Sequence, residues 1–527
     1  RVHRPSRLLD DRCSGLDVVL RSVPGIVPAI GLNADRVVYE RKERRLRIEG
    51  RVELARGADR VRTQIINAFL TPDERGAVYL RAVLDVAGTH FGASGSAGAR
   101  VDFSGKTLGL LTPPNDAAAR EIELEGTPLA PATLASTGGG LVRRLTARRI
   151  EGRMVDGSLK TARAIAGVDL VETPVAGRAA ANAATRTAHS RGALATFGPD
   201  GRIAEAVMNE EVRFTDGKTK AAGQRALLQL DAGTGEFFGS PVEVENDRGR
   251  VTAPHAVWER EANLLRFDGG VRALLTRADD ADLTGSALGD GKGPLWVEAR
   301  EGFYRGAPKS FLFRNNVRAW RGKDLLITDE LRGDAATPTN ATTATNATNA
   351  NNAGDRLNAK GNVRTLWVPE KQAGDKESRE PIEVFASELN YLRDGGRIEY
   401  HGGVRVLQAG RTLQCKDLVV DLNADKKAEK MNCTGEAKLN DPKTGKKISG
   451  ETAIYRVADR VIEISGSPVQ MRDKDNNQIQ GKQVVYWVDG GKVEVRGRAG
   501  AVPATAPPLG GDGGNGSNGR NGGEATP

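Results

Sequence analysis

The feature that most constrains the fold is a short pattern that recurs about every thirty residues along the 527-residue chain. Each copy has a small residue, glycine or asparagine, followed within a few positions by an apolar residue, usually valine. In the C-terminal part, Gly403, Gly435, Gly466 and Gly497 follow one another at steps of 31 or 32 residues. Such a period is typical of units that bury their apolar faces only by stacking on neighbours. We therefore expect a repeat array whose function lies along an extended surface or groove.

The segments between these small residues predict strands. Apolar and polar residues alternate over five to nine positions, as in 34–39 and 46–54, which is typical of half-buried strands. No helical period of comparable length occurs, so we predict an all-β protein. The same beat returns upstream and in the middle of the chain, at Asn209, Gly239 and Gly270 and more loosely at Gly50, Asn316 and Gly361.

Composition shifts predict the domain organisation. A stretch of Ala, Thr and Asn around 335–355 cannot bury a core, and the Gly-rich C-terminus is typical of a disordered tail. The predicted segments are an irregular N-terminal segment (1–30), an N-terminal strand-rich module (31–190), a repeat module (191–334), a low-complexity loop and linker (335–380), a second repeat module (381–498) and a tail (499–527).

Charge and hydropathy exclude several classes of protein. Lys and Arg exceed Asp and Glu by nine, but this excess is spread along the chain and aromatic residues make up only 5%. We therefore predict no nucleic-acid partner. No segment is apolar for the 18 or so residues that span a membrane as a helix. The chain starts at Arg1, and we expect a processed or truncated product whose export signal or membrane anchor is absent from it.

The cysteines and histidines give little sign of chemistry. Cys13, Cys415 and Cys433 form no CxxC pair, so we expect neither a zinc site nor a redox motif. Cys415 and Cys433 lie on neighbouring apolar strands, and both a disulfide and two buried free thiols agree with that position. The five histidines are isolated, with no catalytic motif around them. We therefore expect no enzyme activity, no metal and no cofactor.

The C-terminal residues resemble a known family. The segments 386–391, 396–406 and 412–422 are similar to the OstA/LptA repeat of lipopolysaccharide transport, the family of LptA, LptC and the N-terminal domain of LptD. Two later units, 451–469 and 481–497, keep the same order of strand, turn and small residue. The resemblance covers 380–498 and extends more loosely to 193–334 and 31–55.

The resemblance implies an antiparallel sheet folded over on itself, the β-jellyroll or β-taco, in an elongated array of tandem repeats. It implies a non-enzymatic lipid carrier in the periplasm, tethered to the inner membrane if the missing segment is an anchor. Its cargo would be lipopolysaccharide, held by its lipid A chains. Its partners would be an inner-membrane ABC transporter that exports lipopolysaccharide and an outer-membrane insertion complex, with edge-to-edge self-association as a further option. Because this chain is long, we expect several jellyrolls in series, with 31–190 as an LptC-like module.

Alternation assigns one apolar face of the C-terminal module to the lipid groove. Its predicted lining residues are Ile398, Tyr400, Val404, Val406, Leu418, Val420, Leu422, Ile462, Ile464, Val469 and Met471. We expect a smooth aliphatic lining with few aromatic rings. Arg405 and Arg472 agree both with contacts to cargo phosphates at the rim and with ordinary surface charge.

A second class of protein agrees with the same alternation. A structural or adhesive β-solenoid at the cell surface, with a filled core and no lipid cargo, has the same pattern of apolar residues. An open aliphatic cleft is expected for the lipid carrier, and a filled cross-section for the solenoid. A polysaccharide-cleaving β-helix is disfavoured because the carboxylates are not stacked in phase.

Overall fold

The computed structural model describes residues 16–20, 30–73, 77–91, 100–114, 116, 118–175, 185–247, 249–276, 293–306, 309–334, 356–368, 380–392, 396–423, 427–497 and 500–501. These residues form strands and turns without a helix, which confirms the predicted all-β class. They divide into two compact units. Unit 1 contains the described residues up to Val368, those of 387–398, and Lys427. Unit 2 contains the described residues of 380–386, 399–423 and 428–501.

Unit 1 is built from long strands joined by turns. Its strands are β1 (Leu16–Leu20), β2 (Ile30–Ala34), β3 (Arg36–Glu40), β4 (Arg45–Arg56), β5 (Asp59–Leu70), β6 (Ala77–Phe91), β7 (Arg100–Leu111), β8 (Ala119–Glu125), β9 (Ala132–Gly138), β10 (Leu141–Ala147), β11 (Arg149–Val155), β12 (Ser158–Pro174), β13 (Arg186–Phe197), β14 (Ile203–Asp216), β15 (Thr219–Gln229), β16 (Thr234–Asn246), β17 (Gly249–Glu259), β18 (Leu264–Leu275), β19 (Leu295–Gly306), β20 (Lys309–Arg321), β21 (Asp324–Asp334) and β22 (Arg356–Trp367).

Unit 2 is built in the same way. Its strands are β25 (Arg411–Leu422), β26 (Ala428–Asp441), β27 (Lys446–Arg456), β28 (Val461–Arg472), β29 (Gln478–Trp487), β30 (Val493–Arg496) and β31 (Gly500–Ala501). β23 (Ile382–Leu392) and β24 (Arg397–Gln408) have residues in both units.

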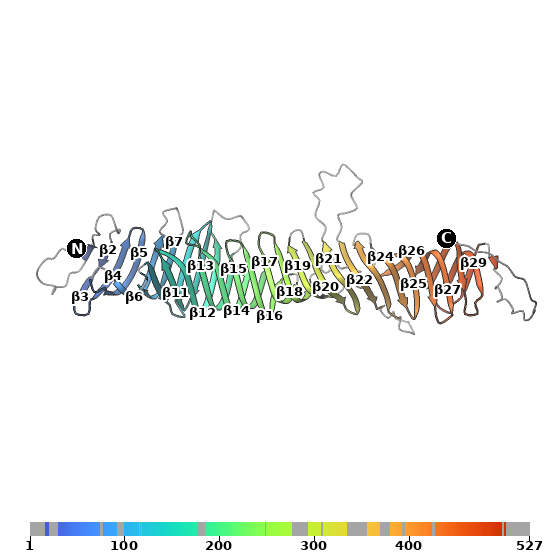
Figure 1. Cartoon of the computed structure of the whole chain (residues 1–527), viewed down its shortest axis with the longest axis horizontal. Coiled ribbons are helices and arrows are strands. Elements are labelled where there is room, and N and C mark those ends of the chain that lie inside the picture. Colours follow the sequence, from blue (N-terminus) through green and yellow to red (C-terminus); the bar gives the residue numbers. More distant parts are fainter. Residues whose placement is uncertain are drawn as a thin grey trace, which may run out of the picture. The chain divides into compact units, whose positions relative to one another are not determined.

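Consecutive strands pair antiparallel. In unit 1 this holds for every neighbouring pair from β12 to β22, as the successive arrows of Figure 1 show. In unit 2 it holds from β25 to β29. One repeat of about thirty residues is therefore one hairpin, a strand out and a strand back. Adjacent hairpins share backbone hydrogen bonds and an apolar face, so each repeat is stabilised by its neighbours.

In many even-numbered strands the small residues of the repeat mark a bulge in the middle of the strand. In β6 and β14 the left-handed residues at the bulge are instead Leu84 and Asp85, and Glu210 and Glu211. At Gly269 and Gly270 of β18 the backbone is left-handed, with φ of 89° and 109°, and the pairing register shifts on both sides. Asn315 and Asn316 of β20 do the same with φ of 65° and 57°. Glycine and asparagine tolerate this conformation best, which is why they recur here. An extra residue in one strand bends it and increases the local twist.

The apolar residue of each repeat follows the bulge and is anchored in the interior. In all these cases the side chain is at most 1% exposed: Val52, Val86, Val168, Val212, Val242, Val271, Val317, Val363, Val404, Ala437 and Val469. The repeat found in the sequence therefore marks a bend in the strand. The bend consists of a left-handed bulge followed by a buried apolar residue.

The bulges divide each folded sheet into two walls. Wall B consists of the residues before the bulge in even-numbered strands and the residues after the bend in odd-numbered strands. Wall A consists of the remaining residues of these strands. Between β7 and β12 the long strands are replaced by pairs of short strands, each of which lies in one wall. β9 and β10 lie in wall A, and β8 and β11 lie in wall B. In unit 1 the walls face each other, because the ring of Phe214 in wall A lies 5.3 Å from that of Trp258 and 5.5 Å from that of Phe237, both in wall B.

Three predicted segments differ from the structure. The linker predicted for 335–380 contains β22, because Leu357, Ala359 and Val363 alternate inward and are buried despite the polar residues beside them. The segment 1–30, predicted to be irregular, contains β1, which pairs with β2. The predicted boundary between 190 and 191 lies inside β13, at its bend, and β13 pairs with β12 and β14 on both sides of this position. The Ala/Thr/Asn stretch 335–355 and the tail beyond 501 lie outside the described residues.

Candidate functional site

The face predicted to line a groove points into the interior. Ten of the eleven predicted residues are buried, and the exception, Leu422, is partly exposed at the end of β25. Ile398 belongs to unit 1 and the other ten to unit 2. Within unit 2, Val406 of wall A and Ile462 of wall B line one apolar pocket together with Ile382, Leu413, Met431, Leu439 and Tyr455. That these residues contact lipid stays a prediction.

The interior of unit 2 is narrow in this structure. A pocket lined by residues of both walls has a volume of about 40 Å³. This is far below the roughly 300 Å³ of typical ligand sites. An acyl chain therefore enters only if the walls move apart or the side chains between them rearrange.

The interior contains a few large aromatic rings. Tyr391, Tyr400, Tyr486 and Phe237 are among the largest fully buried side chains of the described residues. Val, Leu, Ile and Ala nevertheless make up most of the buried apolar residues. That the C-terminal face is a smooth lining for lipid stays a prediction.

Cys415 and Cys433 are joined by a disulfide. Their Cα atoms lie 5.8 Å apart, and the two residues are separated by 18 positions in the sequence. Both are buried, in β25 and β26, and Cys433 lies two residues before the bulge at Gly435. The bond therefore ties two neighbouring strands together at the bend, and it persists only in an oxidising compartment.

A buried polar cluster joins the two walls of unit 2 at their free edges, and we call this edge the mouth. Asp441 of wall A is fully buried and accepts hydrogen bonds from the Arg411 Nε at 3.1 Å and from the Tyr486 hydroxyl of wall B. Arg411 also donates to the Val488 carbonyl, 3.0 Å away on the wall B side. Arg411, Asp441 and Tyr486 form what we call the unit 2 clasp, which holds the mouth shut at this point.

The unit 2 clasp shifts the pKa values of its members. Burial by itself raises the pKa of the Asp441 carboxyl, but hydrogen bonds from Tyr486 and Arg411 outweigh it, and the net pKa lies below its usual value. Burial and the hydrogen bond to Asp441 raise the pKa of the Tyr486 hydroxyl. At pH values between the pKa of Asp441 and the pKa of Tyr486, the carboxylate is charged and the phenol is neutral. This is the state in which the phenol donates its hydrogen bond to the carboxylate.

A second clasp lies in unit 1, around Arg143 of β10. The Arg143 side chain is 4% exposed, and its Nε donates to Glu172 of wall A at 3.0 Å. Its other nitrogens reach the wall B side, at the Ile203 carbonyl (2.6 Å), Asp231 (2.6 Å) and the Leu230 carbonyl (3.1 Å). Arg186 donates to the second oxygen of Glu172 at 2.6 Å. Arg143, Glu172, Arg186 and Asp231 are the unit 1 clasp.

The sequence contains a signal for this clasp. Arg143 lies in phase with the buried Leu145 and Ala147, and Glu172 lies in phase with the buried Val168 and Leu170. A charged residue in the inward phase of a strand must find a partner, because an unpaired buried charge is too costly. The identity of the partners was not predictable, since Ile203 and Asp231 lie 60 and 88 positions away.

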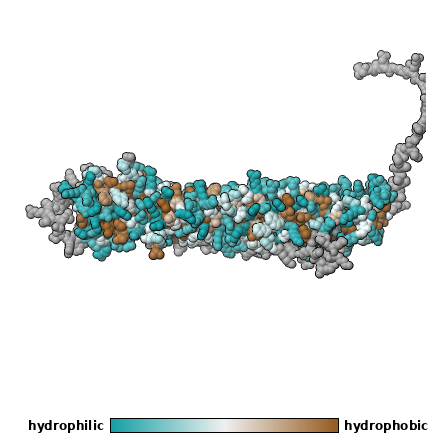
Figure 2. All heavy atoms as spheres, turned by 90° about the horizontal axis from the view of Figure 1, so that it is seen from below, coloured by the Kyte–Doolittle hydropathy of each residue, from teal (hydrophilic) through white to brown (hydrophobic). Residues whose placement is uncertain are grey.

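The outer faces are polar. On the face shown in Figure 2, hydrophilic residues predominate and hydrophobic residues form separate patches. Arg405, considered above as a rim residue, instead lies over the Phe385 ring at 4.5 Å, on the outward phase of β24. Among the described residues no group of three His, Cys, Asp or Glu is placed to hold a metal ion. Within the same residues, no helix has the length and apolar character to cross a membrane.

The fold and interior define a class, an antiparallel β-protein whose sheet folds over an apolar interior with a polar exterior. Residues 383–492 match the family model described as "LptA/(LptD N-terminal domain) LPS transport protein". This match confirms the resemblance to the OstA/LptA family over that part of the chain. No curated protein matches the chain.

Among solved structures, the chain is similar to LptH, "the LptA homologous periplasmic component of the conserved lipopolysaccharide transport device from Pseudomonas aeruginosa". The sequences are 15% identical, and the alignment covers 27% of this chain and 82% of that one with a TM-score of 0.20.

Proposed function

We propose that this protein carries lipopolysaccharide through the periplasm, with the lipid A chains between walls A and B. The observation that carries the proposal is the family match of 383–492, which covers the strands whose inward face is apolar and buried. In this proposal the chain is a non-enzymatic bridge or shuttle between an inner-membrane lipopolysaccharide exporter and an outer-membrane insertion complex. The Cys415–Cys433 disulfide supports an oxidising compartment such as the periplasm.

The physical requirement is a continuous apolar path. Exposing one methylene group to water costs about 0.8 kcal/mol, so a carrier must cover the whole of each acyl chain. The repeated hairpins supply such a path within each unit, because the repeats place the buried residue after the bulge, a valine or Ala437, and its alternating neighbours on the same inner face.

The narrow interior favours a second candidate, a structural solenoid that carries no lipid. The pocket of about 40 Å³ in unit 2 is what a filled core would give. The two candidates differ in whether the walls separate in the cell: they must do so for the carrier and stay together for the solenoid.

A site-specific photo-crosslinking experiment tests the proposal. A photoreactive amino acid replaces either Ile464, which is fully buried, or its neighbour Glu463, whose side chain pairs with Arg456 on the outer face. Met471 and Gln470 of the same strand form a second inward and outward pair. In cells that make lipopolysaccharide we expect lipid adducts at Ile464 and Met471 only. No adduct at any position, in variants shown to be folded and exported, would reject the carrier in favour of the solenoid.

A further inference from the structure

A row of apolar side chains crosses the outer face of wall A in unit 1, where an antiparallel sheet in water usually carries polar residues. Strand pairing places one residue of each strand from β18 to β22 side by side in this row: Leu274, Trp296, Trp320, Leu325 and Leu366. We call these five residues the outer apolar row. Neighbouring strands lie about 4.8 Å apart, so the row is about 19 Å long.

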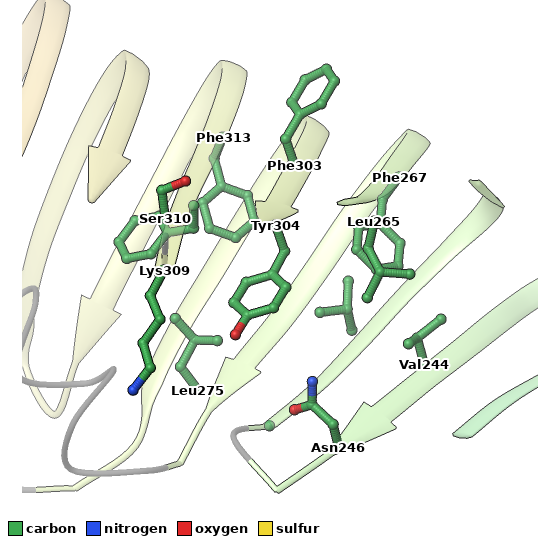
Figure 3. A pocket seen from close by; sticks show the side chains of 13 residues that line it. Val244, Asn246, Leu265, Phe267, Leu275, Phe303, Tyr304, Lys309, Ser310 and Phe313 are labelled. Atoms are coloured by element: carbon green, nitrogen blue, oxygen red, sulfur yellow. The ribbon is translucent and has the colours of Figure 1, made fainter. Parts of the chain in front are cut away.

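Alternation along the strands places this row on the outside. Leu275 lines the pocket between the walls, as Figure 3 shows, so its chain neighbour Leu274 points to the opposite face. Leu295 and Val297 are at most 1% exposed, whereas Trp296 between them is 41% exposed. The other members of the row are partly exposed. The row is therefore accessible from water and does not belong to the apolar interior.

Two tryptophans form the centre of the outer apolar row. The rings of Trp296 and Trp320 lie 6.1 Å apart and are nearly parallel, with an angle of 8° between their planes. Neither side chain makes a hydrogen bond with any residue that the structure describes. An indole has an apolar ring face and one N–H donor at its edge. Both remain available to a ligand here.

A charged row borders the outer apolar row on the side of the bend. Arg272, Glu298 and Arg318 lie side by side, each two positions from the apolar residue of its own strand. The Arg272 Nε lies 3.2 Å from the Glu298 carboxylate. Arg318 is exposed and has no ion-pair partner within the described part of the chain. On the other side lies the free edge of wall A, at the turn between β20 and β21.

This arrangement suits a sugar better than a second folded protein. A sugar ring has a face of C–H groups that packs on an aromatic ring, and hydroxyl groups that hydrogen-bond with guanidinium and carboxylate groups. A stable protein interface buries about 800 Å² on each partner around an apolar centre depleted of charge. The outer apolar row is one residue wide and has charged residues directly beside it. Exposed apolar patches with a polar rim are typical of binding sites.

We propose that the outer apolar row binds the saccharide part of a glycolipid whose lipid part lies between the walls. The inference rests on the proposed function and deepens it. The row lies at the free edge of wall A, where a headgroup that leaves the space between the walls meets water. Trp296 and Trp320 stack on sugar rings, and Arg318 donates hydrogen bonds to hydroxyl or phosphate groups of the saccharide.

The test uses the full chain and, as the probe, the saccharide released from lipopolysaccharide by mild acid hydrolysis, which lacks the acyl chains. Isothermal titration calorimetry measures the dissociation constant. Trp296→Ala should weaken binding about three- to tenfold, as expected for the loss of one stacked ring. Arg318→Gln should weaken it about two- to fivefold, as expected for one exposed charged contact. Both positions are exposed, so we expect the urea midpoint of unfolding to stay unchanged.

Phe303 supplies the matched control on the same strand. It lies in the wall B part of β19, and Figure 3 shows its ring pointing away from the ring of its neighbour Tyr304. The Arg314 guanidinium lies 5.9 Å from the centre of the Phe303 ring. Phe303→Ala therefore removes an aromatic ring beside an arginine from the other wall, and it should leave saccharide binding unchanged. Dextran, a polymer of glucose alone, should bind more weakly than the saccharide of lipopolysaccharide.

The outcomes separate this inference from the proposed function. Saccharide binding that is absent, or indifferent to Trp296→Ala, would overturn the inference, and the carrier stands if Ile464 is labelled by lipid in cells. Binding that depends on Trp296 without a lipid adduct at Ile464 would reject the carrier and the glycolipid but keep the saccharide contact. Equal binding of dextran would overturn the glycolipid as its source. Loss of an oligomer in Trp296→Ala with unchanged saccharide binding would show that the row is a contact between copies of this chain.

Discussion

At the scale of single residues, polar groups at the mouth decide how the walls are held. Asp441 and Tyr486 belong to opposite walls and share one short hydrogen bond within unit 2. Because the pKa of Asp441 is lowered, its contribution to stability is present above its unfolded pKa near 3.8 and is lost as pH falls through the folded value. Because the pKa of Tyr486 is raised, its contribution is present below about pH 10 and is lost as pH rises through the folded value.

We therefore predict that the stability difference between wild type and Tyr486→Phe is constant near neutral pH and shrinks above pH 10. For Asp441→Asn the difference should shrink below pH 3.8 instead. The measurement is the urea midpoint of unfolding of β25 to β29. It is monitored by pulse-labelling hydrogen exchange in the peptides that cover these strands of the intact chain. Tyr455→Phe, at a tyrosine that lines the same interior but does not belong to the unit 2 clasp, is the control variant. A difference that stays constant across pH 10 for Tyr486→Phe would contradict the coupling of the two groups.

The same residues show what alternation can and cannot predict. It placed ten of eleven residues in the interior of the C-terminal module, because strand periodicity is a local property of the sequence. It did not predict the clasps. Arg411 and Val488 lie 77 positions apart, and only the folding of the sheet brings them together.

At the scale of elements, the bulge explains both the repeat and the bend. Gly270 has a φ of 109°, and a Cβ added there would meet no atom within 4 Å. Alanine at this position therefore suffers from its backbone conformation and not from a clash. We predict that Gly270→Ala destabilises unit 1 by roughly 1 to 2 kcal/mol, the cost of a left-handed residue with a side chain.

Gly192 of β13 is the matched control. Its backbone is not left-handed, and an added Cβ would make only an ordinary contact, 3.8 Å from the Ala164 carbonyl oxygen. Gly192→Ala should be neutral or stabilise by up to about 1 kcal/mol, because it restricts the unfolded chain. Urea unfolding with an unchanged m-value reports both changes. Equal effects of the two substitutions would show that backbone handedness at the bulge does not matter.

The element that sequence reasoning missed follows from the same rule. The predicted loop and linker over 335–380 includes the residues of β22, although the low-complexity composition is confined to 335–355. Gly361 nevertheless carries the repeat, with a φ of 78°, and Val363 after it is 1% exposed. A small residue followed by a buried apolar residue therefore indicates a strand of this sheet better than composition does. The reason is that this pattern marks the bend, which occurs only in strands of the sheet.

At the scale of the whole molecule, a repeat array distributes stability in a way that a globular core does not. Each hairpin contacts only its neighbours in the sheet and the opposite wall, so the loss of one contact weakens its surroundings and leaves distant repeats intact. Removing one fastening from each unit tests this: the Arg143–Glu172 pair in unit 1 and the Cys415–Cys433 disulfide in unit 2.

We predict reciprocal, local effects of two variants. Arg143→Met leaves Glu172 buried without one of the two arginines that donate hydrogen bonds to it and should destabilise β10 to β15 by about 3 kcal/mol, as for a broken buried ion pair. Replacing Cys415 and Cys433 by alanine should destabilise β25 to β28 by about 2 to 4 kcal/mol. Hydrogen exchange resolved by peptide is the measurement, and each variant is the control for the other. Protection lost to the same extent in both units would show that they unfold as one cooperative body and that stability does not follow the repeats.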